Sequence, residues 1–326
     1  MITTPEIPSP EPDAGPSPAV PAEPVIAVRG LRKRYGDFEA VRGVDLEVHR
    51  GEIFAFLGPN GAGKTTVVEI LEGFRERTAG DVTVLGSDPA HAGGAWRDRV
   101  GVVLQESSAE PGLTVRECLE LYAGYYRAPR PIAETLALVG LTAKADTPGE
   151  RLSGGQRRRL DVALALVGDP ELIFLDEPTT GFDPSARRAA WDVVAGLRAL
   201  GKTVFLTTHY MDEAERLADR IAVIVGGEIV AAGTPATLGG RDRMDARIRF
   251  SPPAGAGPLP AALRPLAERG ADGAVTVRSE SPLAHVGMLA DWAFGGGFDL
   301  PDLDVRRPTL EDVYLSLTTA DRKDRS

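Results

Sequence analysis

The sequence predicts an α/β fold in which a mostly parallel β-sheet is covered by helices. Short apolar runs without a polar face recur along the chain, and helical patterns lie between them. In addition, a glycine-rich turn follows one apolar run and precedes a helix. The chain has 326 residues, of which 43% are hydrophobic, so it can bury one large or two smaller cores.

Residues 1–24 are predicted to form a disordered tail. They contain eight of the 26 prolines and no lysine or arginine. Such a composition cannot bury a core, and it lacks the basic and apolar regions of a signal peptide. Elsewhere no apolar run approaches the roughly 18–20 residues that span a bilayer. We therefore expect no membrane-spanning helix.

The ordered part is predicted to begin with two strands, VIAVRGLRKRY and FEAVRGVDLEV. They meet at Gly36-Asp37, a turn dipeptide, which predicts an antiparallel β subdomain. EIFAFLG is then a buried strand, and it is followed by the glycine-rich turn and the helix KTTVVEILEGF. RVGVVLQ is a further strand. From about residue 107 to 165 the apolar spacing becomes helical, which predicts a helical subdomain inserted in the sheet.

The strands ELIFLDEP, TVFLTTH and RIAVIVGG follow, with helices predicted near residues 185–199 and 211–218. After residue 239 the pattern loosens. There ARIRF and AVTVRS are predicted strands, and LAHVGMLADWAF is a predicted helix. We therefore divide the chain into the tail (1–24), a main domain (25–239) and a small C-terminal α+β appendage (240–326).

Charge and cysteine content limit the functional classes. The net charge of −10 argues against a nucleic-acid partner, because phosphate backbones require basic surfaces. Cys118 is the only cysteine, so the chain cannot form an intrachain disulfide, and a reducing compartment fits best. We expect Cys118 to be a small core residue on a helix.

A phosphate-binding loop is predicted where EIFAFLG ends. The stretch from Gly58 to Thr65 matches G-x-x-x-x-G-K-[ST] and lies between a strand and a helix, as that motif requires. In such a loop the backbone N–H groups surround phosphate oxygens. Lys64 would supply a cation near the β- and γ-phosphates, and the Thr65 hydroxyl would bind Mg²⁺.

Two acids end the apolar strand ELIFLDEP. Asp176 is placed to face the Mg²⁺, and Glu177 could polarise an attacking water. On this stretch alone they could also be two solvated acids at a strand end. Together with the phosphate loop they indicate a nucleoside triphosphatase.

A second anion site is predicted at RLSGGQRRRLDVALAL. Ser153 and Gln156 have capping-box spacing, and apolar residues then recur on one helix face. Gly154 and Gly155 leave the first N–H groups of the helix open, which favours an anion. The arginines Arg157, Arg158 and Arg159 are interpreted as including solvated or interface residues, with no role in catalysis.

These motifs together resemble the nucleotide-binding subunit of ATP-binding-cassette (ABC) transporters over roughly residues 25–240. GPNGAGKTT resembles Walker A, LSGGQ the family signature, IFLDEP Walker B and TTGFDP the D-loop. Gln105 takes the Q-loop position and His209 that of the switch histidine. LSGGQ is highly specific, and the order and spacing of the motifs agree with the family.

The resemblance implies a role for each matching residue. Glu177 would be the general base, with His209 and Gln105 beside it, and Thr65, Gln105 and Asp176 would hold Mg²⁺. Tyr35 would stack on adenine, although a strand-end aromatic can also be a packing residue. The implied ATP-binding residues are Tyr35, Gly58, Pro59, Asn60, Gly61, Ala62, Gly63, Lys64, Thr65, Thr66, Ser153, Gly154, Gly155, Gln156 and Asp183.

The family also implies partners. Two such subunits dock head to tail, so the signature of one chain would complete the ATP site of the other, with Asp183 at the interface. A separate transmembrane permease would hold this homodimer at the cytoplasmic face of the membrane. The D-loop departs from the common S-x-L-D by reading Thr180-Gly181-Phe182-Asp183. This form, with RRPTLEDVYLSLT, resembles the daunorubicin/doxorubicin type of drug-resistance exporter.

Two alternatives share the ATPase motifs. An importer subunit carries the same nucleotide-binding residues. Soluble ABC ATPases of DNA repair or translation usually have two cassettes, a long coiled-coil insertion or basic surfaces, whereas this chain has one cassette and is acidic. A purely structural cassette is disfavoured because Lys64, Asp176, Glu177 and His209 are all present.

Overall fold

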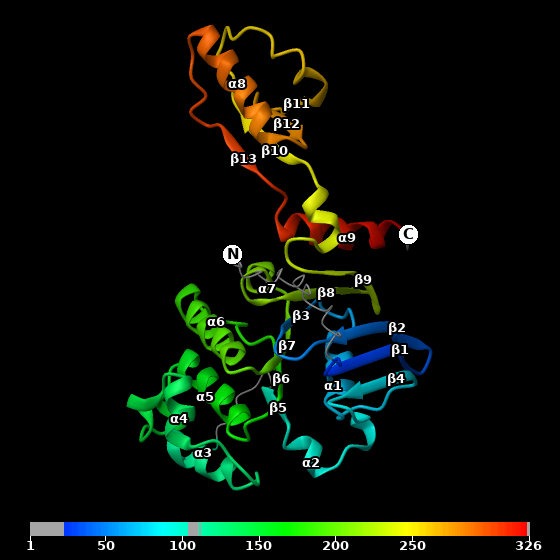
Figure 1. The fold of residues 1–326 in the computed structure, drawn as a ribbon, viewed down its shortest axis with the longest axis vertical. Coiled ribbons are helices and arrows are strands. Elements are labelled where there is room, and N and C mark those ends of the chain that lie inside the picture. Colours follow the sequence, from blue (N-terminus) through cyan, green and yellow to red (C-terminus); the bar gives the residue numbers. More distant parts are fainter. Residues whose placement is uncertain (1–22, 104–109, 111, 325–326) are drawn as a thin grey trace, which may run out of the picture.

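The computed structural model describes residues 23–103, 110 and 112–324, with side chains up to residue 318. Its centre is a six-stranded sheet of order β5-β6-β7-β3-β8-β9 (Figure 1). Only β9 runs antiparallel to its neighbour. The strands are β3 (Ile53–Leu57), β5 (Val100–Val103), β6 (Leu172–Asp176), β7 (Thr203–Thr208), β8 (Arg220–Val225) and β9 (Glu228–Gly233). The predicted α/β class with a mostly parallel sheet is confirmed.

A three-stranded antiparallel sheet packs beside the central sheet. Its order is β2-β1-β4, from β1 (Ile26–Tyr35), β2 (Phe38–Val48) and β4 (Ala79–Val84). Their buried valines and leucines share one apolar cluster with Phe54, Phe174 and Phe205 of the central strands. The helices α1 (Lys64–Leu71) and α2 (Gly94–Arg97) lie against these strands. This packing holds the phosphate loop between two sheets.

The helical subdomain contains α3 (Val115–Ala123), α4 (Ile132–Leu138) and α5 (Gly154–Leu166). Both α3 and α5 begin with a capping box, at Thr114 and Ser153 respectively. A capping box satisfies N–H groups that a helix start leaves open, so the sequence determines where these helices begin. Cys118 is buried in the cluster between α3 and α5, as expected.

Two further helices flank the central sheet. They are α6 (Pro184–Ala199) and α7 (Met211–Leu217), within two residues of the predicted positions. A buried network joins them: Thr179 Oγ1 and Trp191 Nε1 both donate to Glu213 Oε1, at 2.8 and 3.0 Å. Within the described residues no helix is long and apolar enough to cross a membrane.

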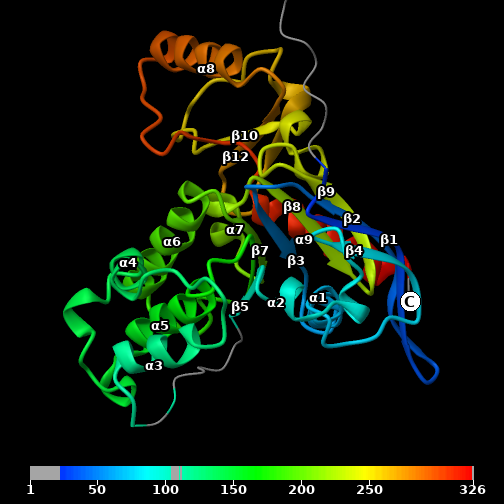
Figure 2. The same ribbon diagram turned by 60° about the horizontal axis from the view of Figure 1, so that its bottom comes forward.

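The C-terminal part forms a separate four-stranded antiparallel sheet of order β11-β12-β10-β13. Its strands are β10 (Ala246–Phe250), β11 (Ala267–Arg269), β12 (Val275–Ser279) and β13 (Asp304–Arg306). Helix α8 (Pro282–Gly296) covers one face, where Ile248, Phe250 and Val277 are buried. Figures 1 and 2 show this unit standing away from the central sheet.

The chain then returns to the main domain. Helix α9 (Leu310–Asp324) lies between the C-terminal sheet and β8 and β9 (Figure 1). Leu310 and Val313 are buried, and Leu310 joins the cluster that contains Leu57 of β3. The apolar face of α9 therefore packs on the main domain of the same chain.

Several elements were not predicted from the sequence: β4, β9, β11, β13 and α2. Most are short or mix polar residues into the strand, so their apolar period is weak. Whether such a segment forms a strand depends on its pairing with neighbouring strands in a sheet. Nearly all of the predicted tail, and Gln105, lie outside the described residues.

Candidate functional site

The phosphate loop lies between β3 and α1, as the motif requires. Gly63 is in the left-handed region, with φ of 105°, and a Cβ there would lie 2.7 Å from the Ala40 carbonyl oxygen. A Cβ at Gly58 would lie 2.4 Å from the Ile224 carbonyl oxygen. Any larger residue at either position would push the loop off its neighbours, so both glycines are needed for its shape.

Lys64 is held inside the loop, with 6% of its surface exposed. Its Nζ donates to the carbonyl oxygens of Gly58 at 2.7 Å and Pro59 at 3.3 Å, and lies 3.9 Å from Glu177 Oε1. Burial lowers the pKa of Lys64, while the charges of Glu177 and Asp176 oppose that shift. The loop therefore carries a fixed cation directly beside the two acids.

A pocket of about 660 Å³ opens over the loop. Tyr35 forms one wall, half-exposed, with its hydroxyl 3.5 Å from Thr66 Oγ1. The cationic ends of Lys33 and Arg75 lie 5.2 and 5.4 Å from its ring centroid. Sequence reasoning missed Arg75 and Phe38, which also line the pocket. An exposed aromatic directly after the Gly36-Asp37 turn was the available signal for Phe38.

Asp176 ends β6 and faces the neighbouring strand. Thr207 Oγ1 of β7 donates a hydrogen bond to Asp176 Oδ1, which fixes the direction of the carboxylate. Thr207 was not singled out from the sequence, since a threonine near a strand end is common. The second carboxylate oxygen of Asp176 makes no hydrogen bond among the described residues.

Glu177 has a strained backbone, with a left-handed φ of 44°. Such a conformation costs a non-glycine residue about 1–3 kcal/mol and is typical of functional positions. Its N–H bonds both the carbonyl and the hydroxyl of Thr207, at 3.1 and 3.0 Å. On its side chain, Thr180 Oγ1 donates to Oε2 at 3.1 Å, and His209 Nδ1 lies 3.3 Å from the same oxygen. The fold thus gathers Lys64, Asp176, Glu177 and His209 into one site.

The signature helix α5 begins as predicted. Ser153 Oγ accepts from Gln156 N–H at 3.3 Å, and Gln156 Oε1 accepts from Ser153 N–H at 3.0 Å. These residues line a separate pocket of about 380 Å³ together with Gly181 and Asp183. Asp183 Oδ1 caps α6 by accepting from Ser185 and Ala186 N–H. Of the residues described, none from the phosphate loop lines this pocket.

The three arginines on α5 differ in their surroundings. Arg158 is buried, and it donates to the carbonyl oxygens of Pro178 at 3.2 Å and Asp176 at 3.0 Å. It therefore ties the signature helix to the strand end that carries the acids. Arg157 is exposed as expected.

Comparison with known proteins agrees with this geometry. Residues 41–180 match the family model described as ABC transporter. The daunorubicin resistance ATP-binding protein DrrA3 of Streptomyces coeruleorubidus is 40% identical over 314 residues, which is 93% of this chain and 98% of that protein. This chain belongs to the ABC transporter family. It is an ATP-binding, ATP-hydrolysing subunit.

A second curated relative, a solved structure and a second family model are also similar to this ABC ATPase. A Nod factor export ATP-binding protein I from Cupriavidus pinatubonensis is 39% identical, covering 95% of this chain and 94% of its own. A dimeric post-hydrolysis state of the ATP-binding cassette MJ0796, bound to ADP and Pi, superimposes with a TM-score of 0.57 at 27% identity, covering 64% of this chain and 98% of that one. Residues 246–309 of the ABC ATPase match the family model described as ABC transporter domain-containing protein-like, C-terminal domain.

Proposed function

We propose that this ABC ATPase dimerises around ATP and powers a separate membrane permease that exports drugs or other hydrophobic compounds. The observation that carries the proposal is the separation of two half-sites on one chain. The phosphate loop and Glu177 line one pocket, while Ser153, Gly154, Gly155 and Gln156 line another that no described residue of the phosphate loop lines. One chain carries both the phosphate-loop half and the signature half of an ATP site. Two identical chains docked head to tail would therefore form two full sites, each from the phosphate loop of one chain and the signature of the other.

Within the site, the glycine amides and Lys64 bind the phosphates, and Tyr35 with its flanking cations takes the adenine. Asp176 and Thr65 supply a carboxylate and a hydroxyl, the hard oxygen donors that Mg²⁺ prefers, and we place the ion there with Gln105. When bound, the Mg²⁺ neutralises charge on the phosphates. The remaining chemistry belongs to the side chains of this chain.

Glu177 orients the attacking water and accepts its proton. The strained turn after β6 points its carboxylate into the pocket that holds Lys64. Thr180 donates to Oε2 of that carboxylate and His209 lies against the same oxygen, so Oε1 is the better-placed proton acceptor. His209 Nδ1 is buried and lies 3.3 Å from Glu177 Oε2 without forming a hydrogen bond, so it is placed to steady the base.

Cysteine cross-linking tests the shared site. Asn60 and Ser153 are exposed, whereas Ala62 is buried and unsuitable. In a Cys118→Ala, Glu177→Gln background, one chain carries Asn60→Cys and the other carries Ser153→Cys. We expect ATP to produce a covalent dimer in the mixture, because a disulfide needs Cα atoms within about 7 Å and a short thiol linker extends that reach.

The control pairs Asn60→Cys with Glu228→Cys, an exposed position on β9. That mixture should remain monomeric on a non-reducing gel. If Asn60 and Ser153 join only within a doubly substituted chain, and never between mixed chains that are shown to dimerise, the shared site is wrong.

We place the permease contact in a groove between the central sheet and the helical subdomain. This groove of about 250 Å³ is lined by aromatic and apolar side chains, among them Phe74, Trp96, Tyr122 and Tyr126. Phe74 is 72% exposed. A large aromatic that is open to water at the rim of a groove is typical of a protein contact. An apolar helix end of the permease fits this chemistry.

Replacing Phe74 with serine is expected to reduce permease binding at least tenfold, because interface aromatics often contribute 2 kcal/mol or more. Basal ATP hydrolysis without permease should change less than about twofold, since Phe74 lies outside the proposed catalytic set. Tyr125→Ser is the matched control, because Tyr125 is 73% exposed and outside the groove. Co-purification with the permease encoded by a neighbouring gene gives the measurement. Equal recovery of the two variants would contradict this docking site.

The direction of transport rests on the relatives. DrrA3 is named for daunorubicin resistance, and the Nod factor proteins are named for export. We therefore propose that this chain lies peripherally at the cytoplasmic face of the membrane and powers export. Vesicles that contain the permease and this subunit should then accumulate substrate when ATP is added outside to an inverted membrane.

A further inference from the structure

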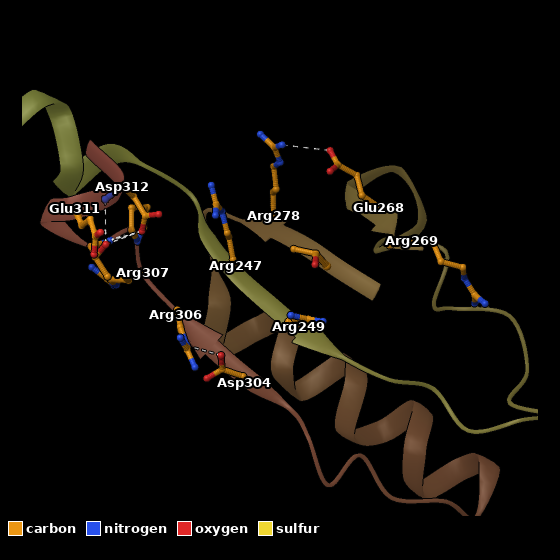
Figure 3. Close-up of a pocket in the computed structure, with 14 residues that line it drawn as sticks. Arg247, Arg249, Glu268, Arg269, Arg278, Asp304, Arg306, Arg307, Glu311 and Asp312 are labelled. Carbon is orange, nitrogen blue, oxygen red and sulfur yellow. Dashed lines mark hydrogen bonds and ion pairs between the residues drawn. The ribbon is translucent and has the colours of Figure 1, made fainter. Parts of the chain in front are cut away.

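The C-terminal sheet leaves one face open, and arginines dominate it. Strand β10 alternates between buried Ile248 and Phe250, which face α8, and exposed Arg247 and Arg249. Arg278 of β12 and Arg306 of β13 are exposed in the same sheet. Figure 3 shows Arg247 and Arg278 extending from adjacent strands to the same side. We call Arg247, Arg249, Arg278 and Arg306 the arginine face.

Three of these arginines form a row across the sheet. In the strand register Arg247 is directly opposite Arg278 on one side and Arg306 on the other. Like charges directly opposite each other destabilise a sheet. The sheet is stabilised by its apolar face under α8, so the stability of the fold does not require this row of arginines. It stands out further in a chain whose net charge is −10.

Acidic neighbours neutralise only part of this charge. Arg249, Arg278 and Arg306 pair with Asp272, Glu268 and Asp304 respectively. Arg247, Arg269 and Arg307 line a hollow of about 760 Å³, and the arginine face forms the floor of this hollow. These three arginines form no ion pair within the described part of the chain, although Glu311 and Asp312 also line the hollow and, after the hydrogen bonds from Thr309, the charge of Arg247 helps to lower the pKa of Asp312. The walls of the hollow are the end of β11 on one side and the start of α9 on the other.

We propose that this hollow binds a small soluble molecule that carries several phosphate groups. Guanidinium groups bind phosphate oxygens in bidentate fashion, and a row of them matches more than one phosphate. The volume is in the range of small-molecule sites. The walls of the hollow favour a compact ligand over a flat membrane surface. Exposed ion pairs at the rim are weak and can exchange their acids for phosphate.

A ligand in this hollow would contact the element that joins the C-terminal sheet to the main domain. Thr309 and Asp312 line the hollow, and Asp312 Oδ2 accepts from the Thr309 N–H and hydroxyl at 2.8 Å to cap α9. Leu310, the residue after Thr309, packs in the same buried cluster as Leu57, and Leu57 directly precedes Gly58 of the phosphate loop. The site is therefore positioned to act as an effector site on the ATPase.

Isothermal titration with inorganic tripolyphosphate tests the proposal on the full chain. The phosphate loop also binds such an anion, so the titration is done in a Lys64→Ala background. Arg247→Gln with Arg307→Gln removes two unpaired cations of the hollow. Arg127→Gln with Arg243→Gln removes the same charge from exposed positions outside it. We expect one site per chain, weakened at least tenfold by the first pair and less than twofold by the second.

Three results would overturn the proposal. One is the absence of tripolyphosphate binding in the Lys64→Ala chain. Another is an equal loss in the two paired variants, which would indicate general charge attraction. The third is binding to phosphatidylglycerol vesicles that depends on Arg247 and Arg307 and that tripolyphosphate does not displace, which would identify a membrane surface instead. None of these depends on dimerisation or on permease binding.

Discussion

Replacing Glu177 with glutamine is expected to lower the steady-state rate of ATP hydrolysis by about 10²–10⁴-fold while ATP binding remains. The amide keeps the size of the side chain but cannot accept a proton. In the structure Glu177 has a left-handed φ of 44°, and its N–H donates to both the carbonyl oxygen and the hydroxyl of Thr207, so the variant should keep its position. A fluorescent ATP analogue and a phosphate-release assay measure the two properties separately.

The control for this experiment is Glu228→Gln, an exposed glutamate on β9. Its rate should remain within twofold of wild type. The Glu177→Gln chain should also accumulate as an ATP-bound dimer in size-exclusion chromatography, because hydrolysis no longer reopens it. A hydrolysis rate within tenfold of wild type would show that Glu177 is not the base.

Replacing Glu72 with glutamine is expected to remove a large pH dependence of stability. Glu72 is 8% exposed at the end of α1, and burial, then the charges of Asp176 and Glu69, raise its pKa from 4.5 to about 8. Between these two values the folded chain holds a proton that the unfolded chain has lost. The free energy of unfolding therefore falls as the pH rises through this window and levels off above about pH 8.

Over pH 5.5 to 8.5 this single group should cost the wild type about 3 kcal/mol of stability. Glu72→Gln should lose that slope and be the more stable protein at pH 8.5, provided the amide fits the same space. Denaturant unfolding at several pH values measures the effect. Glu120→Gln, on an exposed glutamate of α3, should retain the wild-type slope. Parallel pH profiles for wild type and Glu72→Gln would contradict the raised pKa.

Glu72 also connects two parts of the proposed mechanism. It lines the groove assigned to the permease and lies within electrostatic reach of Asp176. A carboxyl group that is neutral at pH 7 can sit in this apolar groove, whereas a second charge beside Asp176 would be costly. No sequence pattern indicates this role, since Glu72 follows a helix like many exposed glutamates.

The sequence by itself determined the central strands, the phosphate loop and the start of α5. The apolar runs that became β3, β6, β7 and β8 are buried on both faces, and such runs have few alternatives in a folded chain. The phosphate loop and the capping box of α5 are local too, because neighbouring residues supply both donors and acceptors. Local physics therefore predicted these parts correctly.

Only the tertiary structure decided the features that depend on distant segments. Thr207 orients Asp176 and receives the Glu177 N–H from a strand some thirty residues away, and Arg158 is buried because strand β6 ends beside it. The row of Arg247, Arg278 and Arg306 exists only in the strand register. Cross-strand neighbours, burial and the resulting pKa values arise when separate segments pack together, and no local period or spacing encodes them.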